Sequence, residues 1–156
     1  MSKIAVIQIR GAVKLSKKIK STLEMLNLKK KNSCIIVEAN NVNIGMVNVV
    51  KDYVTWGEIN EQVIKELLLK RGKIVGNKLL DEDYLIKNIK LNLDSFIKEF
   101  INNNKKLRDI PGFKPYFRLK PPIKGFERGG IKQPYSLGGA LGYRKEKINE
   151  LIMRML

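Results

Sequence analysis

Residues 11–38 constrain the fold of this chain most strongly, because they read as an amphipathic helix that leads into a buried strand. Ile19, Leu23 and Leu26 fall at i, i+4 and i+7, so they line one face of a helix with 3.6 residues per turn. Ser16 is a suitable N-cap for this helix. Most lysines of the stretch fall on the other sides, and a run of three lysines follows directly. We therefore expect one helix face in a core and a positively charged surface around it.

The segments on either side of this stretch complete a compact unit. Residues 3–9 are mostly apolar and β-rich, as in a strand in the middle of a sheet or beneath helices. A second strand is expected over 33–38, a second helix over about 43–51 and a third strand over 53–59. The first 58 residues therefore read as β-α-β-α-β, with two helices packed on one face of a sheet. The predicted fold class is α+β.

Residues 59–110 are more helical and more balanced in charge. An apolar stripe with helical spacing precedes Gly72, which is a good helix stop. A further helix is expected to begin near Asp81, and Asp94 is expected to cap another. The acidic residues at Asp81 and directly after it are interpreted as first-turn charges that complement a helix dipole, rather than as a catalytic pair.

Residues 111–156 combine basic residues with glycines, prolines and aromatic side chains. Most of the aromatic side chains, Phe113 and Phe117 among them, are expected to anchor an irregular segment in the core, while stacking on unpaired bases stays an open alternative. The glycine-rich runs GFERGG and GGALG lack the spacing of a phosphate-binding loop. A last helix is expected over residues 144–156, with its apolar side inward.

The charge of the chain is its dominant compositional feature, with 31 Lys and Arg against 15 Asp and Glu and a formal net charge of +16. Residues 1–57 and 111–156 each carry 10 basic and 3 acidic residues. An excess of this size repels itself unless a polyanion neutralises it, which indicates nucleic acid or an anionic membrane surface as a partner. The helices have core-facing stripes and little aromatic anchoring, so nucleic acid is favoured.

Residue content excludes several classes of function. The chain has no histidine and a single cysteine, Cys34, which excludes an internal disulfide, a Cys/His zinc cluster and a histidine-dependent triad. Cys34 lies in the apolar run SCIIV and is interpreted as a small buried hydrophobe. No apolar run approaches the ~18–20 residues of a membrane span. The N-terminal residues lack the long apolar core of a signal peptide, so we expect an intracellular protein.

Two long collinear segments give the chain a family resemblance. With the strand before them, GAVKLSKKIKSTLEMLNLKKKNSCIIVE and NVNIGMVNVVKDYVTWGEI make residues 3–59 resemble the large-subunit ribosomal protein family numbered thirty, called seven in eukaryotes. The sequences LLLKRGK and RLKPPIKGFERGGIKQPYSLGGALGYRKEKINELIMRML resemble the longer archaeal and eukaryotic form. The long basic arm of the eukaryotic form does not precede this unit, so the archaeal form is the better match.

This resemblance implies a structural protein of the large ribosomal subunit that binds its rRNA and has no catalytic activity, cofactor or metal. It also implies a three-stranded antiparallel sheet with two helices packed on it. The positions that match the family's rRNA-facing loop and helix start, its basic turn and its second helix are Gly11, Lys14, Lys17, Lys18, Lys29, Lys30, Lys31, Asn43, Gly45 and Asn48. In the C-terminal segment, positive charge alone nominates as rRNA contacts Lys114, Arg118, Lys120, Lys124, Arg128, Lys132 and Arg144.

The expected organisation is a β-α-β-α-β rRNA-binding core over 1–58, a helical extension over 59–110, and a basic Gly/Pro/aromatic segment with a terminal helix over 111–156. The expected partners are large-subunit rRNA and neighbouring ribosomal proteins, in the cytoplasm and within the ribosome, with no membrane and no small-molecule substrate. Two alternatives stay open. One is a free-standing nucleic-acid chaperone or chromatin-like binding protein, and the other is an RNA-processing enzyme whose site the sequence does not reveal.

Overall fold

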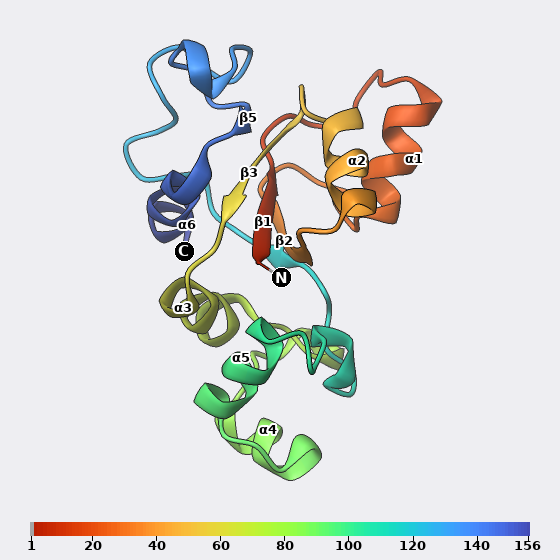
Figure 1. Ribbon diagram of the computed structural model, residues 1–156, viewed down its shortest axis with the longest axis vertical. Helices are drawn as coiled ribbons and strands as arrows, with labels where there is room; N and C mark the ends of the chain where they lie inside the picture. Colours follow the sequence, from red (N-terminus) through yellow and green to blue (C-terminus); the bar gives the residue numbers. More distant parts are fainter. Residues whose placement is uncertain (1) are drawn as a thin grey trace.

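The centre of the protein is a mixed five-stranded β-sheet in the computed structural model, which describes residues 2–156 (Figure 1). Its strands lie in the order β4-β2-β1-β3-β5. In chain order they are β1 (Lys3–Gln8), β2 (Ser33–Glu38), β3 (Val54–Glu58), β4 (Phe117–Arg118) and β5 (Gly142–Tyr143). Helices and strands alternate through the first part of the chain and then separate, so the predicted α+β class is confirmed.

The sheet is larger than the three-stranded antiparallel sheet that was expected, so that expectation was incomplete. β2, β1 and β3 form an antiparallel centre, in which Ile7 lies opposite both Cys34 and Thr55. β4 extends this centre antiparallel to β2, and β5 extends it parallel to β3. Each added strand has only two residues and lies in an irregular segment, so no alternation of apolar and polar residues marks it in the sequence.

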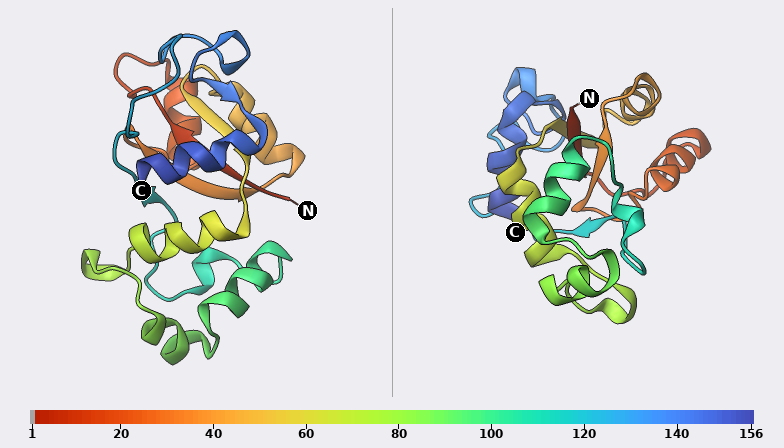
Figure 2. Two further views of the ribbon diagram at one scale, coloured as in Figure 1. Left: turned by 90° about the vertical axis from the view of Figure 1, so that its left-hand side faces the viewer. Right: turned by 60° about the horizontal axis from the view of Figure 1, so that its bottom comes forward.

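Helices cover both faces of the sheet (Figure 2). One face carries α1 (Lys17–Met25) and α2 (Asn41–Val49). The opposite face carries α3 (Glu61–Arg71), α5 (Leu93–Ile101) and α6 (Ile148–Met155). The helix α4 (Glu82–Ile89) lies beyond α5, at the bottom of Figure 1. Short 3-10 turns connect these elements at Val75–Asn77, Leu107–Asp109, Tyr135–Leu137 and Lys145–Lys147.

Burial on both sides explains why the first strand is almost wholly apolar. Ile4 and Val6 point into the cluster beneath α1 and α2, whereas Ala5 and Ile7 point into the cluster on the other face. All six residues of β1 are buried, since the strand lies in the middle of the sheet. The prediction of a central strand beneath helices is confirmed. Apolar residues on both sides let one short strand take part in two cores.

Two predicted helix caps, Ser16 and Asp94, have different outcomes. Ser16 caps α1, and its Oγ accepts a hydrogen bond from the backbone N–H of Ile19, as predicted. The expectation that Asp94 caps the next helix was wrong, because α5 begins at Leu93 after the N-cap residue Asn92. Asp94 lies in the first turn instead, where its charge complements the helix dipole.

The C-terminal segment is anchored by aromatic and aliphatic side chains. Phe113 and Phe117 are buried in edge-to-face contact, with ring centroids 6.1 Å apart, which confirms their expected role in the core. The predicted inward face of the last helix is also confirmed. Its fully buried members are Ile148, Leu151, Ile152 and Met155. Because β4, β5 and α6 share the sheet and core of the first residues, the three expected segments are structurally interdependent.

Candidate nucleic-acid interface

Loops from distant parts of the chain meet at one end of the sheet. β1 ends there at Gln8, while its antiparallel neighbours begin there, at Ser33 and Val54. The N–H of Asn32 donates to the Gln8 carbonyl over 2.8 Å, and the N–H of Leu119 donates to the Asn32 carbonyl over 2.9 Å, which adds the C-terminal segment. We call this surface the basic end and define it by the side chains of Arg10, Lys29, Lys30, Lys31, Lys51, Arg118, Lys120 and Lys132.

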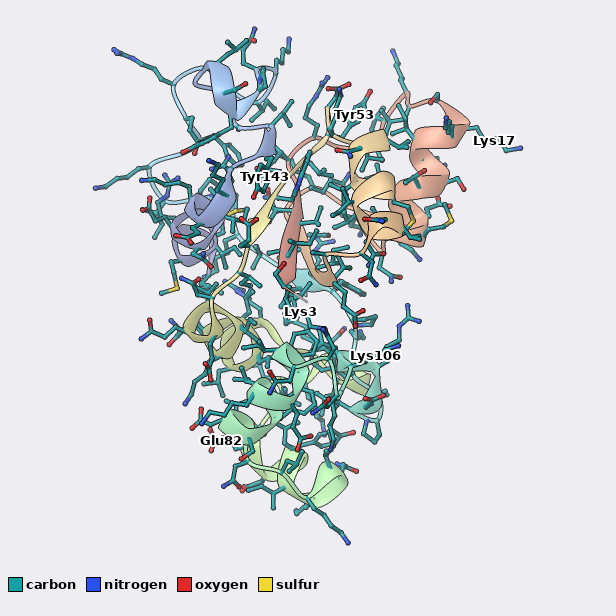
Figure 3. All side chains as sticks on the ribbon, in the orientation of Figure 1. Lys3, Lys17, Tyr53, Glu82, Lys106 and Tyr143 are labelled. Atoms are coloured by element: carbon teal, nitrogen blue, oxygen red, sulfur yellow. The ribbon has the colours of Figure 1, made fainter. Side chains whose placement is uncertain are left out.

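The charges of the basic end are uncompensated. Its lysines and Arg118 are exposed, and Arg10 is half-buried. Within residues 2–156, none of these side chains forms an ion pair. The loop after Arg10 leads to the exposed Lys14, and α1 then begins with the exposed Lys17 and Lys18; Figure 3 shows Lys17 at the outer end of this helix. The arrangement can therefore neutralise several phosphates at once.

At the opposite end of the sheet, Lys3 uses its charge internally. Lys3 is buried, its ammonium lies 3.3 Å from the Glu38 carboxylate, and it also lies 4.4 Å from the centroid of the Phe100 ring. Burial lowers the pKa of Lys3, although the Glu38 carboxylate opposes that shift. These contacts tie β1 to β2 and α5, so this lysine is not available to an outside partner.

The predicted C-terminal contacts separate into three groups. Arg118, Lys120 and Lys132 join the basic end. Lys124 and Arg128 are exposed on the long loop that follows β4. Lys114 does not join them, because its backbone N–H donates to Lys73 and its ammonium donates to the side chain of Asn77, in the helical extension.

Arg144 corrects one prediction, because it lies in the interior with 2% of its surface exposed. Its guanidinium donates to Glu127 over 2.6 Å, to the Thr55 hydroxyl over 2.8 Å and to the Ala140 carbonyl over 2.8 Å. It also lies 4.8 Å from the centroid of the Tyr135 ring. A buried guanidinium needs such partners. Arg144 therefore fastens the C-terminal segment to β3, and its guanidinium is hydrogen-bonded inside the chain.

The predicted positions on α2 differ in exposure. Asn43 is half-buried near the opposite end of the sheet, where its side-chain amide donates to the Glu38 carbonyl over 2.9 Å. Gly45 and Asn48 are exposed on the helix surface. A Cβ added at Gly45 would meet nothing within 4 Å, so nothing in this chain requires glycine there.

Comparison with known proteins relates this chain to a single group. The family described as ribosomal protein L30p/L7e matches residues 4–54. The large ribosomal subunit protein uL30 of Methanococcus vannielii is 44% identical over 152 residues, which cover 97% of this chain and 98% of that protein. The chain belongs to the L30p/L7e family. The uL30 proteins of Methanopyrus kandleri and Nanoarchaeum equitans are each 41% identical, over 95% and 100% of this chain and over their full lengths.

These matches confirm the predicted family, and its archaeal form in particular. The L30p/L7e match over residues 4–54 takes in β1, α1, β2 and α2. That part of the chain contributes Arg10, the lysine turn and Lys51 to the basic end. The remaining members, Arg118, Lys120 and Lys132, lie outside the family match but inside the near-full-length similarity to the uL30 proteins.

Sequence reasoning missed two members of the basic end, Arg10 and Lys51. Arg10 directly follows the expected first strand, and Lys51 is the last residue of the expected second helix. This position at the end of an element was the available signal. The glycine runs have a structural use in this L30p/L7e protein. The N–H of Gly129 donates to the Gly138 carbonyl over 2.9 Å, and a Cβ at Gly139 would lie 2.0 Å from the carbonyl oxygen of Gln133. The two runs therefore pack backbone against backbone.

Within residues 2–156, no helix is long and apolar enough to cross a bilayer. The same residues contain no group of three or more His, Cys, Asp or Glu side chains positioned to hold a metal ion. Cys34 is buried, and burial raises the pKa of its thiol far above the ordinary value, as expected for a small hydrophobe inside the core.

Proposed function

We propose that this protein is a structural constituent of the large ribosomal subunit, in the cytoplasm, and that it binds large-subunit rRNA. The observation that carries the proposal is the near-full-length identity to proteins named large ribosomal subunit protein uL30. The position of the basic residues at one end of the sheet supports it. The role requires no catalytic step, cofactor or small-molecule substrate.

The basic end is the surface that we assign to rRNA. Its exposed lysines have no carboxylate partner among the described residues, so each is available to a phosphate, and neutralising phosphates releases condensed counterions. Lys17 and Lys18 extend this surface at the N-terminus of α1, where backbone N–H groups also favour an anion. The rigid sheet behind these loops holds them in one arrangement, which suits recognition of folded RNA by shape.

The three segments are proposed to have distinct roles. Residues 1–58 form the rRNA-binding core and include the predicted contacts Gly11, Lys14, Gly45 and Asn48. Residues 111–156 supply a second set of contacts, from β4 and the loop after it. Residues 59–110 are nearly balanced in charge and support the sheet from the other face, where neighbouring ribosomal proteins can meet them.

The double substitution Lys17→Glu, Lys18→Glu tests this surface. We expect weaker association with large-subunit rRNA, and a salt dependence of log K that is shallower by about one to two, because up to two phosphate contacts are lost. The measurement is filter binding of the full-length protein to large-subunit rRNA over a series of salt concentrations. Sucrose-gradient sedimentation of a lysate then shows how much of the variant enters large subunits.

The control carries the same charge change elsewhere. Lys87→Glu, Lys98→Glu alters two exposed lysines on α4 and α5, away from the basic end, and should leave both readouts near wild type. Wild-type behaviour of the Lys17/Lys18 variant would overturn the assignment of this surface. The alternative of a free-standing nucleic-acid chaperone predicts equal affinity for unrelated RNA and DNA, and no wild-type protein in the large-subunit fraction after a high-salt wash.

A further inference from the structure

A cleft beside the edge strand β5 differs in chemistry from the rest of the basic end. Its volume is about 550 Å³, within the ~300–1,000 Å³ range of ligand pockets. Three aromatic and three basic side chains form much of its lining. They are Tyr53, Trp56, Tyr143, Arg10, Lys51 and Lys132. None of the aromatic residues was among the rRNA contacts predicted from the sequence.

The register of the sheet places two of these aromatic rings side by side. Trp56 on β3 pairs with Tyr143 on β5, so both side chains project from the same face of the sheet. Their ring centroids are 6.2 Å apart, with 34° between the planes. Trp56 is half-buried against the cluster beneath α1 and α2, whereas Tyr143 is 46% exposed. The two rings thus form an aromatic surface, which we call the ledge, in which Trp56 packs against the core and Tyr143 is open to solvent.

The ring of Tyr143 is held in place by its hydroxyl, which donates a hydrogen bond to the Glu58 carboxylate. That hydrogen bond is the main reason why the pKa of Tyr143 is raised to about 12. A tyrosine that only filled the core would bury its ring. This one keeps an open face while its polar atom is satisfied, which suits stacking by a flat partner.

Positive charge surrounds the ledge. The Arg10 guanidinium lies 5.1 Å from the centroid of the Tyr53 ring, and it donates to the Asp52 carbonyl over 3.4 Å. Lys51 and Lys132 are far apart in the sequence, but both are exposed and both line this cleft. The Asp52 carboxylate is the single acidic group in the lining, so three cations outnumber it. Figure 3 labels Tyr53 and Tyr143, which both lie in the upper half of the view near β3.

We propose that this cleft takes one unpaired nucleotide of the bound rRNA, with the base stacked on Tyr143 and the adjoining phosphates beside Lys51 and Lys132. The proposal rests on the proposed function and adds a single-stranded element to it. Bases inside a helix are stacked on one another, so only a splayed base can reach an aromatic ring. Aromatic faces combined with cations are the means by which proteins hold single-stranded nucleic acid.

Trp56 is the only tryptophan, so its fluorescence reports on this cleft directly. The full-length protein is titrated with a single-stranded RNA of about eight adenosines, with an RNA duplex of equal length, and with inorganic polyphosphate as a charge-only probe. We expect the single strand to quench Trp56 fluorescence strongly. The duplex and the polyphosphate should bind through the basic end with much less quenching.

Three variants separate stacking from charge. Tyr143→Leu should weaken binding of the single strand by about tenfold and leave the salt dependence unchanged, because a stacking contact is lost. Tyr143→Phe should retain most of the affinity, since the ring remains. Lys51→Ala, Lys132→Ala should reduce the salt slope by about one. The charge-matched control, Lys87→Ala, Lys98→Ala, should change neither affinity nor slope.

Three results would overturn the nucleotide site. The first is equal quenching by single strand and polyphosphate. The second is a wild-type affinity for Tyr143→Leu, in protein whose thermal unfolding shows it to be folded. The third is Trp56 fluorescence that RNA does not change but that is protected from acrylamide quenching in assembled subunits. That result would assign the cleft to a neighbouring protein. The proposed function itself would be overturned by a different result, the absence of wild-type protein from the large-subunit fraction.

Discussion

Two ion pairs are drawn into the interior, and each connects segments that are distant in sequence. Lys3 meets Glu38 between the two antiparallel strands and also covers the Phe100 ring of α5. Arg144 meets Glu127, and its guanidinium is also bound to β3. Removing one member of such a pair leaves the other charge poorly solvated, which is strongly destabilising. These two basic residues therefore act as internal fasteners, unlike the lysines of the basic end.

Glu127→Gln tests the fastening role of Arg144 at the residue scale. Burial by itself would raise the pKa of Glu127, but the hydrogen bonds and charge of Arg144 outweigh it and hold that pKa below its ordinary value. A carboxylate with a lowered pKa in the folded state stabilises the protein above its unfolded-state pKa, and this contribution is lost as the pH falls through the folded-state pKa. The variant should lose about 2–3 kcal/mol of unfolding free energy at pH 7.

The corresponding measurement is urea unfolding at several pH values between 7 and 3. Wild-type stability should fall as the pH drops below about 4.5, and the variant should show a smaller decline over that range. Glu150→Gln is the control, because that carboxylate is exposed and pairs with an exposed lysine, Lys147. If the unfolding free energies of wild type and Glu127→Gln fall equally as the pH drops, the Glu127–Arg144 pair does not cause the loss of stability at low pH.

At the scale of elements, close backbone contacts hold the C-terminal segment against the sheet. Gly57 on β3 is the clearest case, because a Cβ there would lie 1.9 Å from the carbonyl oxygen of Lys145. The 3-10 turn that precedes α6 can therefore approach β3 only where the side chain is absent. The ends of α1 and α3, by contrast, are set by local signals, Ser16 and Gly72. Local capping and long-range backbone contact thus place different elements.

Two glycine substitutions distinguish the effect of a close backbone contact from the effect of helix propensity. Gly57→Ala should destabilise the protein by at least about 2 kcal/mol, because backbone must move to admit the methyl group. Gly45→Ala, within α2 and facing open space, should stabilise the free protein by about 0.5–1 kcal/mol through higher helix propensity. Urea unfolding of both variants checks the two signs.

Gly45→Ala also tests a proposed rRNA contact. If rRNA backbone lies against Gly45, the added methyl group should weaken incorporation into large subunits even though the free protein is more stable. Sedimentation of variant and wild type in competition measures that incorporation. Equal incorporation would remove Gly45 from the rRNA surface and leave its glycine without a structural reason in this chain.

At the scale of the whole molecule, the sheet separates two cores and holds its basic loops at one end. The face opposite α1 and α2 is covered only by elements from residues 59–156. Within residues 1–58, the apolar side chains that reach that face are Ala5, Ile7, Ile9, Cys34 and Ile36. Lys3 and Thr55 also reach it, through the Phe100 ring and Arg144. Residues 1–58 therefore depend on the later segments for the burial of one face of their sheet.

Expression of residues 1–58 alone tests this dependence. The fragment should expose its second apolar face, bind the dye ANS and self-associate in sedimentation velocity, because an uncovered apolar patch of this kind is rarely tolerated in solution. Ile7→Ser, Ile36→Ser in the same fragment should reduce both effects. A monomeric fragment that does not bind the dye would show that residues 1–58 fold independently.

The sequence alone determined the features that depend on short-range periodicity and composition. The mostly apolar run of β1, the stripe of α1, the core face of α6 and the excess of positive charge all follow from residue order, and the first three predicted the α+β class. The family was predicted from the resemblance of two long collinear segments. Such patterns are readable because a helix or strand repeats its environment every few residues.

Tertiary structure alone decided which basic residues share a surface and which are buried. Arg144 and Lys132 look alike in the sequence, yet one is inside and the other faces out. The difference arises from strand register, since β5 pairs with β3 and thereby carries Arg144 to Thr55 and Tyr143 to Trp56. Pairings between residues more than eighty positions apart depend on the packing of the whole chain, and no local pattern encodes them.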